Sequence, residues 1–173
     1  ATGARVRHLP VPGTDLPNVF YLRDSRHVDD IRARVEAGKR AVIIGGGYIG
    51  LETAASLSKR GMAVTLLEAQ PRILQRVTSE TMSDFYRRVH TEEGVHIVED
   101  CLAASITLVN DELCVQTSCG QAFDAHMVVI GIGVIPNTEL AEFAGLDIVD
   151  GIAVNEYCQT SDPDIYAIGD VSW

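Results

Sequence analysis

A glycine-rich turn between a buried strand and a helix constrains this chain more than any other feature. The run 41–44 is wholly apolar and mostly β-branched, which is typical of a parallel strand covered on both faces. Gly45-Gly46-Gly47-Tyr48-Ile49-Gly50 follows it directly, and a helical pattern then extends to about Arg60, where Gly61 ends it. A second buried run, 63–67, completes a βαβ unit of about 30 residues. The sequence therefore predicts an α/β fold of the Rossmann type with a parallel sheet.

The spacing of the glycines matches a dinucleotide-binding turn. Gly45 permits the tight turn, Gly47 lets the backbone approach a pyrophosphate, and Gly50 lets the helix pack closely on the strand. The start of the helix adds unpaired N–H groups and about half a positive charge. Gly46, Tyr48 and Ile49 complete the predicted contact segment. A purely structural glycine turn is the alternative interpretation, and the strand and helix on either side favour dinucleotide binding.

An acid after the second strand indicates which dinucleotide binds. Glu68 follows Gly50 at close to the spacing of ~20 residues expected for an acid that binds the adenosine ribose. Its carboxylate would accept hydrogen bonds from a free 2′-hydroxyl and repel a 2′-phosphate, so we expect NADH to be preferred over NADPH. Arg72, four residues further on, is the residue that could meet a 2′-phosphate instead.

The rest of the chain predicts further elements of the same fold. In chain order they are an extended, proline-rich connector to about Arg26, a helix over 28–37, a helix over 79–92, a strand over 95–98, an antiparallel meander over 102–123, a strand over 127–130 and a short helix over 138–144. We therefore expect a Rossmann-like three-layer NAD-binding domain with a parallel sheet and an antiparallel β-meander.

Composition excludes several classes of function. The formal net charge of −10 argues against nucleic acid as a partner, since phosphate binding requires clustered Lys and Arg. No apolar run approaches the ~20 residues needed to cross a bilayer, so we expect no membrane span. Four cysteines do not suggest a secreted disulfide scaffold, and a cytoplasmic location is the expectation.

The cysteines and histidines predict no chemistry of their own. Cys114 and Cys119 have the spacing of a redox disulfide, but they fall in the predicted meander, so we expect the match to be accidental. The five histidines are scattered and lack metal-ligand spacing. We expect neither a metal site nor a catalytic side chain.

Three longer motifs resemble a known family. They are 45–52, the segment Gly131-Ile132-Gly133-Val134-Ile135-Pro136-Asn137, and the closing stretch 160–170. Together they resemble the FAD-dependent pyridine nucleotide-disulfide oxidoreductase superfamily, in particular its ferredoxin reductase branch, which includes rubredoxin and putidaredoxin reductases. The resemblance covers the whole chain.

The resemblance implies that this chain is part of a longer flavoprotein. Residues 1–16 would be a connector from the FAD domain, 17–137 the NAD(H)-binding domain, and 138–173 a further part of the FAD domain. Asp170 would then contact FAD in the intact protein, while Tyr48 would cover the nicotinamide pocket and Glu52 would lie near the carboxamide. The predicted cofactor-contacting residues are Gly45, Gly46, Gly47, Tyr48, Ile49, Gly50, Glu52, Glu68, Arg72, Gly131, Ile132, Gly133, Val134 and Asp170.

The resemblance also implies a reaction. In such a protein hydride would pass from NADH to FAD, and electrons would then pass to a 2Fe-2S ferredoxin or a rubredoxin that serves an oxygenase. We expect the 173-residue chain alone to bind nucleotide without turnover. The alternatives are an NADH oxidase, a nitrite reductase, a monodehydroascorbate-type reductase, or a nucleotide-binding module without a catalytic role.

Overall fold

The computed structural model describes residues 1–173, which form two compact units. The sheet unit comprises residues 8–133, and the terminal unit comprises residues 1–7 together with 134–173. No helix in the structure combines the length and hydrophobicity that crossing a bilayer requires.

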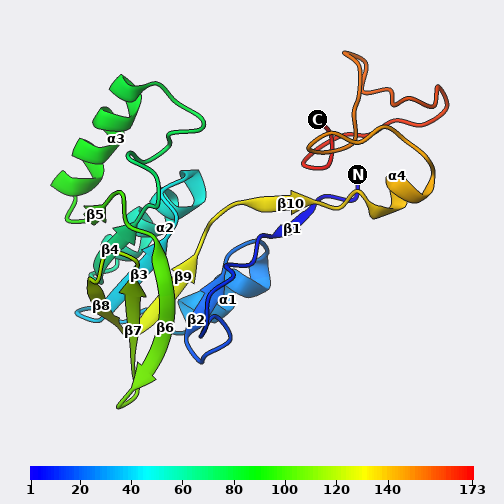
Figure 1. The fold of residues 1–173 in the computed structure, drawn as a ribbon. Helices are drawn as coiled ribbons and strands as arrows, with labels where there is room; N and C mark the ends of the chain where they lie inside the picture. The colour runs from blue at the N-terminus through cyan, green and yellow to red at the C-terminus, as the bar shows by residue number, and fades with distance from the viewer. The chain divides into compact units, whose positions relative to one another are not determined.

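A five-stranded sheet is the centre of the sheet unit, and all its neighbouring strands are parallel (Figure 1). Its strands, in spatial order, are β2 (Val19–Tyr21), β9 (Met127–Ile130), β3 (Arg40–Ile44), β4 (Ala63–Leu67) and β5 (His96–Val98). Helix α2 (Tyr48–Ser58) connects β3 to β4, and α3 (Glu80–Glu92) connects β4 to β5. The predicted parallel sheet is confirmed.

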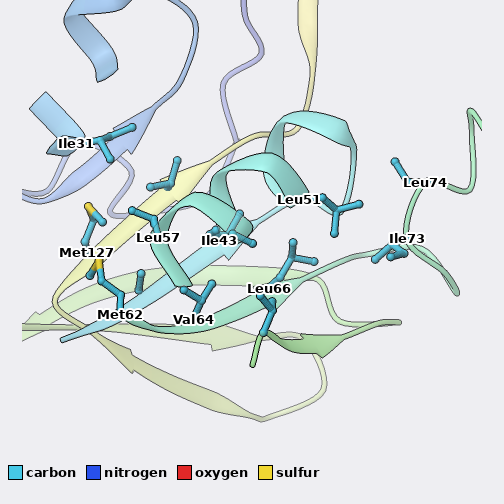
Figure 2. Close-up of a cluster of buried hydrophobic side chains, with 14 residues drawn as sticks. Ile31, Ile43, Leu51, Leu57, Met62, Val64, Leu66, Ile73, Leu74 and Met127 are labelled. Atoms are coloured by element: carbon cyan, nitrogen blue, oxygen red, sulfur yellow. The ribbon is translucent and has the colours of Figure 1, made fainter. Parts of the chain in front are cut away.

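Side chains of the sheet alternate between two buried layers, as the pleat of a strand requires. On one face Ile43, Leu66 and Val129 pack with Leu51 and Leu57 of α2. Figure 2 shows this layer, in which the helix lies across the central strands. The other face of the same strands packs against a second sheet, so both faces are covered and the strands are apolar throughout.

The second sheet is a three-stranded antiparallel meander. Its strands are β6 (Ala103–Val109), β7 (Glu112–Thr117) and β8 (Ala122–Ala125). Ile106, Leu113 and Val115 of this meander are buried against Val42 and Ile130 of the parallel sheet. Helices, parallel sheet and meander therefore make the three layers that the sequence predicts.

Two predictions for the first 40 residues are corrected. The predicted connector contains strand β2, which pairs with β9 at the edge of the sheet. Helix α1 spans Ser25–Arg32 instead of 28–37. It begins early because the Asp24 carboxylate accepts hydrogen bonds from the N–H groups of Arg26 and His27, and the His27 bond holds the pKa of Asp24 below its usual value. Val35, placed in the helix by its spacing, lies after the helix and still packs on the same core.

The terminal unit has its own, smaller core. Strands β1 (Ala4–Val6) and β10 (Val134–Pro136) pair antiparallel, and the short helix α4 (Glu139–Phe143) follows β10. Its buried hydrophobic cluster consists of Ala141, Ile152, Ala167 and Val171. Residues 8–16, expected to belong with the FAD-domain connector, lie in the sheet unit because Leu9 packs in its core and the Pro12 carbonyl accepts from the Ile106 N–H. The division of the chain between two cofactor domains stays a prediction.

Candidate dinucleotide-binding site

The three glycines of the motif have different surroundings. Gly45 has φ +113°, and a Cβ on it would lie 2.5 Å from the Gly131 carbonyl oxygen. A Cβ on Gly50 would lie only 1.9 Å from the Gly45 carbonyl oxygen. A Cβ on Gly47 would meet nothing within 4 Å. The first and third glycines are therefore required by packing, while the backbone at Gly47 faces open space.

The start of helix α2 presents unpaired hydrogen-bond donors at this open position. Gly47 is the N-cap and has no side chain to satisfy the helix, whose first internal bond runs from the Leu51 N–H to the Gly47 carbonyl at 3.0 Å. The N–H groups of residues 47–50, which precede Leu51, have no intrahelical acceptor. Together with the positive end of the helix dipole, they form a site suited to a phosphate.

Glu68 is fixed beside the turn by two hydrogen bonds. One carboxylate oxygen accepts from the Gly46 N–H at 2.6 Å, and the other accepts from the Gln70 N–H at 2.7 Å. Glu68 is partly exposed at the carboxyl end of β4. An ionised carboxylate has about four lone-pair positions, so acceptor capacity remains for the hydroxyl groups of a ribose. A Cβ on Gly46 would lie 2.8 Å from this carboxylate, which accounts for the middle glycine of the run.

Arg72 makes hydrogen bonds within the protein that were not predicted from the sequence. Its guanidinium donates to Ser83 Oγ at 2.5 Å and to the carbonyl oxygens of Gln75 and Thr78 at 3.2 and 3.1 Å. Ser83 is fully buried and donates in turn to the Ile73 carbonyl. These bonds hold the loop after β4 against α3, and contact between Arg72 and a 2′-phosphate would require them to rearrange.

The loop after β4 supports the glycine turn through residues that sequence reasoning missed. The Leu74 N–H donates to the Gly46 carbonyl at 2.9 Å, and the buried Ile73 side chain lies beside Gly46. Glu99 accepts from the Ile73 N–H at 2.8 Å and pairs with Arg87 at 3.0 Å. Glu99 directly follows β5, so the rule that functional groups gather at the carboxyl ends of parallel strands could have identified it.

The segment after β9 reaches the same edge of the sheet. The Gly131 N–H donates to the Ile44 carbonyl at 2.8 Å, and Ile132 packs on the core that faces the meander. Gly133 has φ +97° and ends the sheet unit. The structure thus brings Gly131 to the glycine turn. Val134 begins β10 of the terminal unit, which also contains Asp170.

Tyr48 and Glu52 lie on the first two turns of α2. The Tyr48 ring is 47% exposed, and its edge contacts the Tyr86 ring of α3 at a centroid distance of 6.4 Å. Glu52 is exposed and lines a cavity of about 370 Å³ between α1 and α2, together with Ile49 and Thr53. Their predicted roles near the nicotinamide stay predictions.

A family model described as pyridine nucleotide-disulphide oxidoreductase matches residues 1–173. The chain belongs to this family. It is 43% identical to rhodocoxin reductase from Rhodococcus erythropolis and 44% identical to putidaredoxin reductase from Pseudomonas putida, over 98% of the chain in each case. The matches cover 40% and 42% of those two proteins, so the chain spans about two fifths of the length of these relatives.

Solved structures of family members share the fold. The crystal structure of the ferredoxin reductase for the CYP199A2 system from Rhodopseudomonas palustris superposes with a TM-score of 0.92 at 40% identity, covering 99% of this chain and 43% of that one. The putidaredoxin reductase in its covalent complex with putidaredoxin gives the same TM-score at 43% identity, with the same coverage. The predicted membership of this family is confirmed, as is the mixed α/β fold.

Proposed function

We propose that this chain is the NADH-binding part of an FAD-dependent reductase that supplies electrons to a ferredoxin or rubredoxin of an oxygenase system. The observation that carries the proposal is the open backbone at Gly47, at an uncapped helix start and next to the fixed carboxylate of Glu68. Pyrophosphate would bind to the donors of the turn, and the adenosine ribose would bind to Glu68.

Names of the relatives support the wider reaction. A protein from Pseudomonas putida that is 37% identical over 98% of this chain is a rubredoxin-NAD(+) reductase, and the chain covers 44% of its length. A protein from Burkholderia cepacia that is 38% identical is the ferredoxin-NAD(+) reductase component of an anthranilate 1,2-dioxygenase system. We infer NADH as the electron donor, an iron–sulfur protein as the acceptor, and a cytoplasmic location from the sequence.

Residues of this chain have separate tasks in the proposed mechanism. The glycine turn and Glu68 would fix the adenosine half of NADH, so that the nicotinamide end lies towards Tyr48, Glu52 and Gly131. FAD, when bound, would supply the hydride and single-electron chemistry. Gly169 and Asp170 would hold part of the FAD, and a Cβ on Gly169 would meet nothing within 4 Å, so the backbone there is open to a ligand.

Calorimetric titration of the chain with NADH and NADPH tests the dinucleotide assignment. NADH should bind more tightly, and Gly47→Arg should abolish binding because its side chain fills the open space. In Glu68→Gln the amide oxygen can still accept from the Gly46 N–H, but the charge is lost. We expect the preference for NADH to fall about tenfold or more, since a hydrogen bond to a charged group contributes about 1.5–3 kcal/mol.

Glu92→Gln is the matched control, because it removes the same charge from an exposed position at the end of α3. It should leave both affinities unchanged. Equal binding of NADH and NADPH by the wild-type chain, or no binding by a chain that circular dichroism shows to be folded, would reject the assignment. Steady-state electron transfer from NADH to a ferredoxin by the full-length protein would separate the proposed reductase from an NADH oxidase and from a non-catalytic module.

A further inference from the structure

Two cysteines distant in the sequence lie side by side in the meander. Cys101 precedes β6, and Cys119 lies in the turn between β7 and β8. Ala103 pairs with Thr117 across the β6–β7 ladder, and the Ser118 N–H donates to the Leu102 carbonyl at 2.9 Å. The β6–β7 ladder ends at this pair, and Cys119 lies in the turn directly after it, where the Gly120 N–H donates to the Thr117 carbonyl at 3.1 Å.

The two thiols share one hydrogen-bond partner. Both thiols donate to the same acceptor, the Gln121 side-chain oxygen, at 3.8 Å from Cys101 and 3.7 Å from Cys119. Each thiol is close enough to the other to influence its pKa.

The two thiols differ in the way that a reactive thiol and its resolving partner require. Cys119 is exposed, and Thr117 Oγ1 lies 3.2 Å from its sulfur. Hydrogen bonds from the Thr117 side chain, from the Gln121 backbone and from Cys101 stabilise its thiolate and lower the pKa of Cys119. Cys101 is 2% exposed, and burial raises its pKa. Because the thiolate is the nucleophile, Cys119 is the thiol that reacts first.

We propose that Cys119 and Cys101 form a reversible thiol–disulfide site that reacts with small-molecule disulfides such as oxidised glutathione. The Cys119 thiolate attacks one sulfur of the small disulfide, whose S–S bond breaks and releases one small thiolate. Cys101 then loses its proton to solvent and attacks the Cys119 sulfur, which expels the second small thiolate and forms the Cys101–Cys119 bond. Two protein thiols are oxidised, and one small disulfide is reduced to two thiols, which take up the protons.

This site adjoins the segment that carries Glu68 but does not depend on the dinucleotide assignment. The Cys101 N–H donates to the Glu68 carbonyl at 2.9 Å, so one residue belongs to the thiol pair and contacts the end of β4. Cys114 has no such partner. It lies on β7, and burial together with the neighbouring Asp124 carboxylate raises its pKa.

The test exposes the reduced chain to oxidised glutathione, blocks the remaining thiols at intervals, and maps the products by mass spectrometry. In the wild type we expect a peptide pair linked through Cys101 and Cys119 that dithiothreitol removes. Cys101→Ala should stop at a glutathione adduct on Cys119, and Cys119→Ser should give neither product. Cys114→Ser and Cys158→Ser are matched controls that should leave the linked pair intact.

Three results would overturn the proposal. The first is modification of Cys119 no faster than that of Cys158. The second is a glutathione adduct on Cys119 that persists in the wild type as it does in Cys101→Ala. The third is a linked pair that survives in Cys119→Ser. Circular dichroism of each variant establishes that it is folded before the products are compared.

Discussion

Substitution of Gly50 should destabilise the fold, whereas substitution of Gly47 should have little effect on stability. In Gly50→Ala the new Cβ would lie 1.9 Å from the Gly45 carbonyl oxygen, well inside contact distance. The turn cannot easily move away, because the Gly45 N–H is bound to the Leu67 carbonyl at 2.8 Å and the Gly131 carbonyl lies against its other side. The strain therefore falls on the packing of α2 against β3.

The size of the effect follows from two opposing contributions. Overpacking costs typically about 1–3 kcal/mol, and so short a contact with fixed backbone belongs at the upper end. The higher helix propensity of alanine returns about 1 kcal/mol. We expect a net loss of about 2 kcal/mol in the free energy of unfolding, which lowers the midpoint of thermal unfolding by about 4–8 °C for a domain of this size.

Gly47→Ala is the control, because its Cβ would meet nothing within 4 Å and its φ of −80° suits any residue. Its loss should stay below about 1 kcal/mol, the cost of a poorer N-cap. Urea and thermal unfolding followed by circular dichroism measure both variants. Equal losses for the two variants, or a Gly50→Ala chain as stable as the wild type, would refute the packing argument.

Three further predictions concern residues around the site and the core. Ser83→Ala should lower the free energy of unfolding by about 1–3 kcal/mol, since the Ile73 carbonyl loses its buried donor. Ser79→Ala is the control in the same urea titration and should change the free energy of unfolding much less, because the Ser79 side chain makes no cap bond. Leu66→Ala removes a fully buried side chain from the helix-facing layer and should cost about 2–5 kcal/mol in that assay, and a loss near zero would contradict the packing in Figure 2. Burial lowers the pKa of His90 in the folded chain below its ordinary value of 6.5. The buried neutral side chain therefore contributes its full stability above pH 6.5, and this contribution is lost as the pH falls through the lowered pKa. The stability difference between the wild type and His90→Gln, measured across this range, should therefore move against the wild type in acid, and a difference independent of pH would exclude the effect.

Much of the site could be read directly from the sequence. The apolar run of β3, the glycine spacing and the position of Glu68 are local patterns, and each reflects a constraint that acts within a few residues or along one βαβ unit. Positive φ at Gly45 and the contact of Gly50 with the turn belong to that unit, so no distant residue was needed to predict them. For the same reason the parallel sheet and the meander followed from alternation and turn residues.

The start of the chain was less predictable. Three residues are too few for periodicity to reveal β2, which is a strand because β9 offers an unpaired edge. The start of α1 depended on the Asp24 cap, and Val35 kept its helical spacing because it packs on the core rather than because the helix continues. The prediction therefore failed at β2 because a tertiary contact decides it, and at the start of α1 because the local Asp24 cap was not recognised.

The sequence by itself determined the fold class, the glycine turn and the acid beside it, because these depend on neighbours along the chain. Only the tertiary structure decided which side chains distant in sequence contact one another or the loops of the site. Arg72 is bound to Ser83, Glu99 supports the loop beside Gly46, and Cys119 lies next to Cys101 instead of Cys114. Such pairs depend on the register between strands and on how loops pack after the sheet has formed, and a residue's own neighbourhood in the sequence does not encode either.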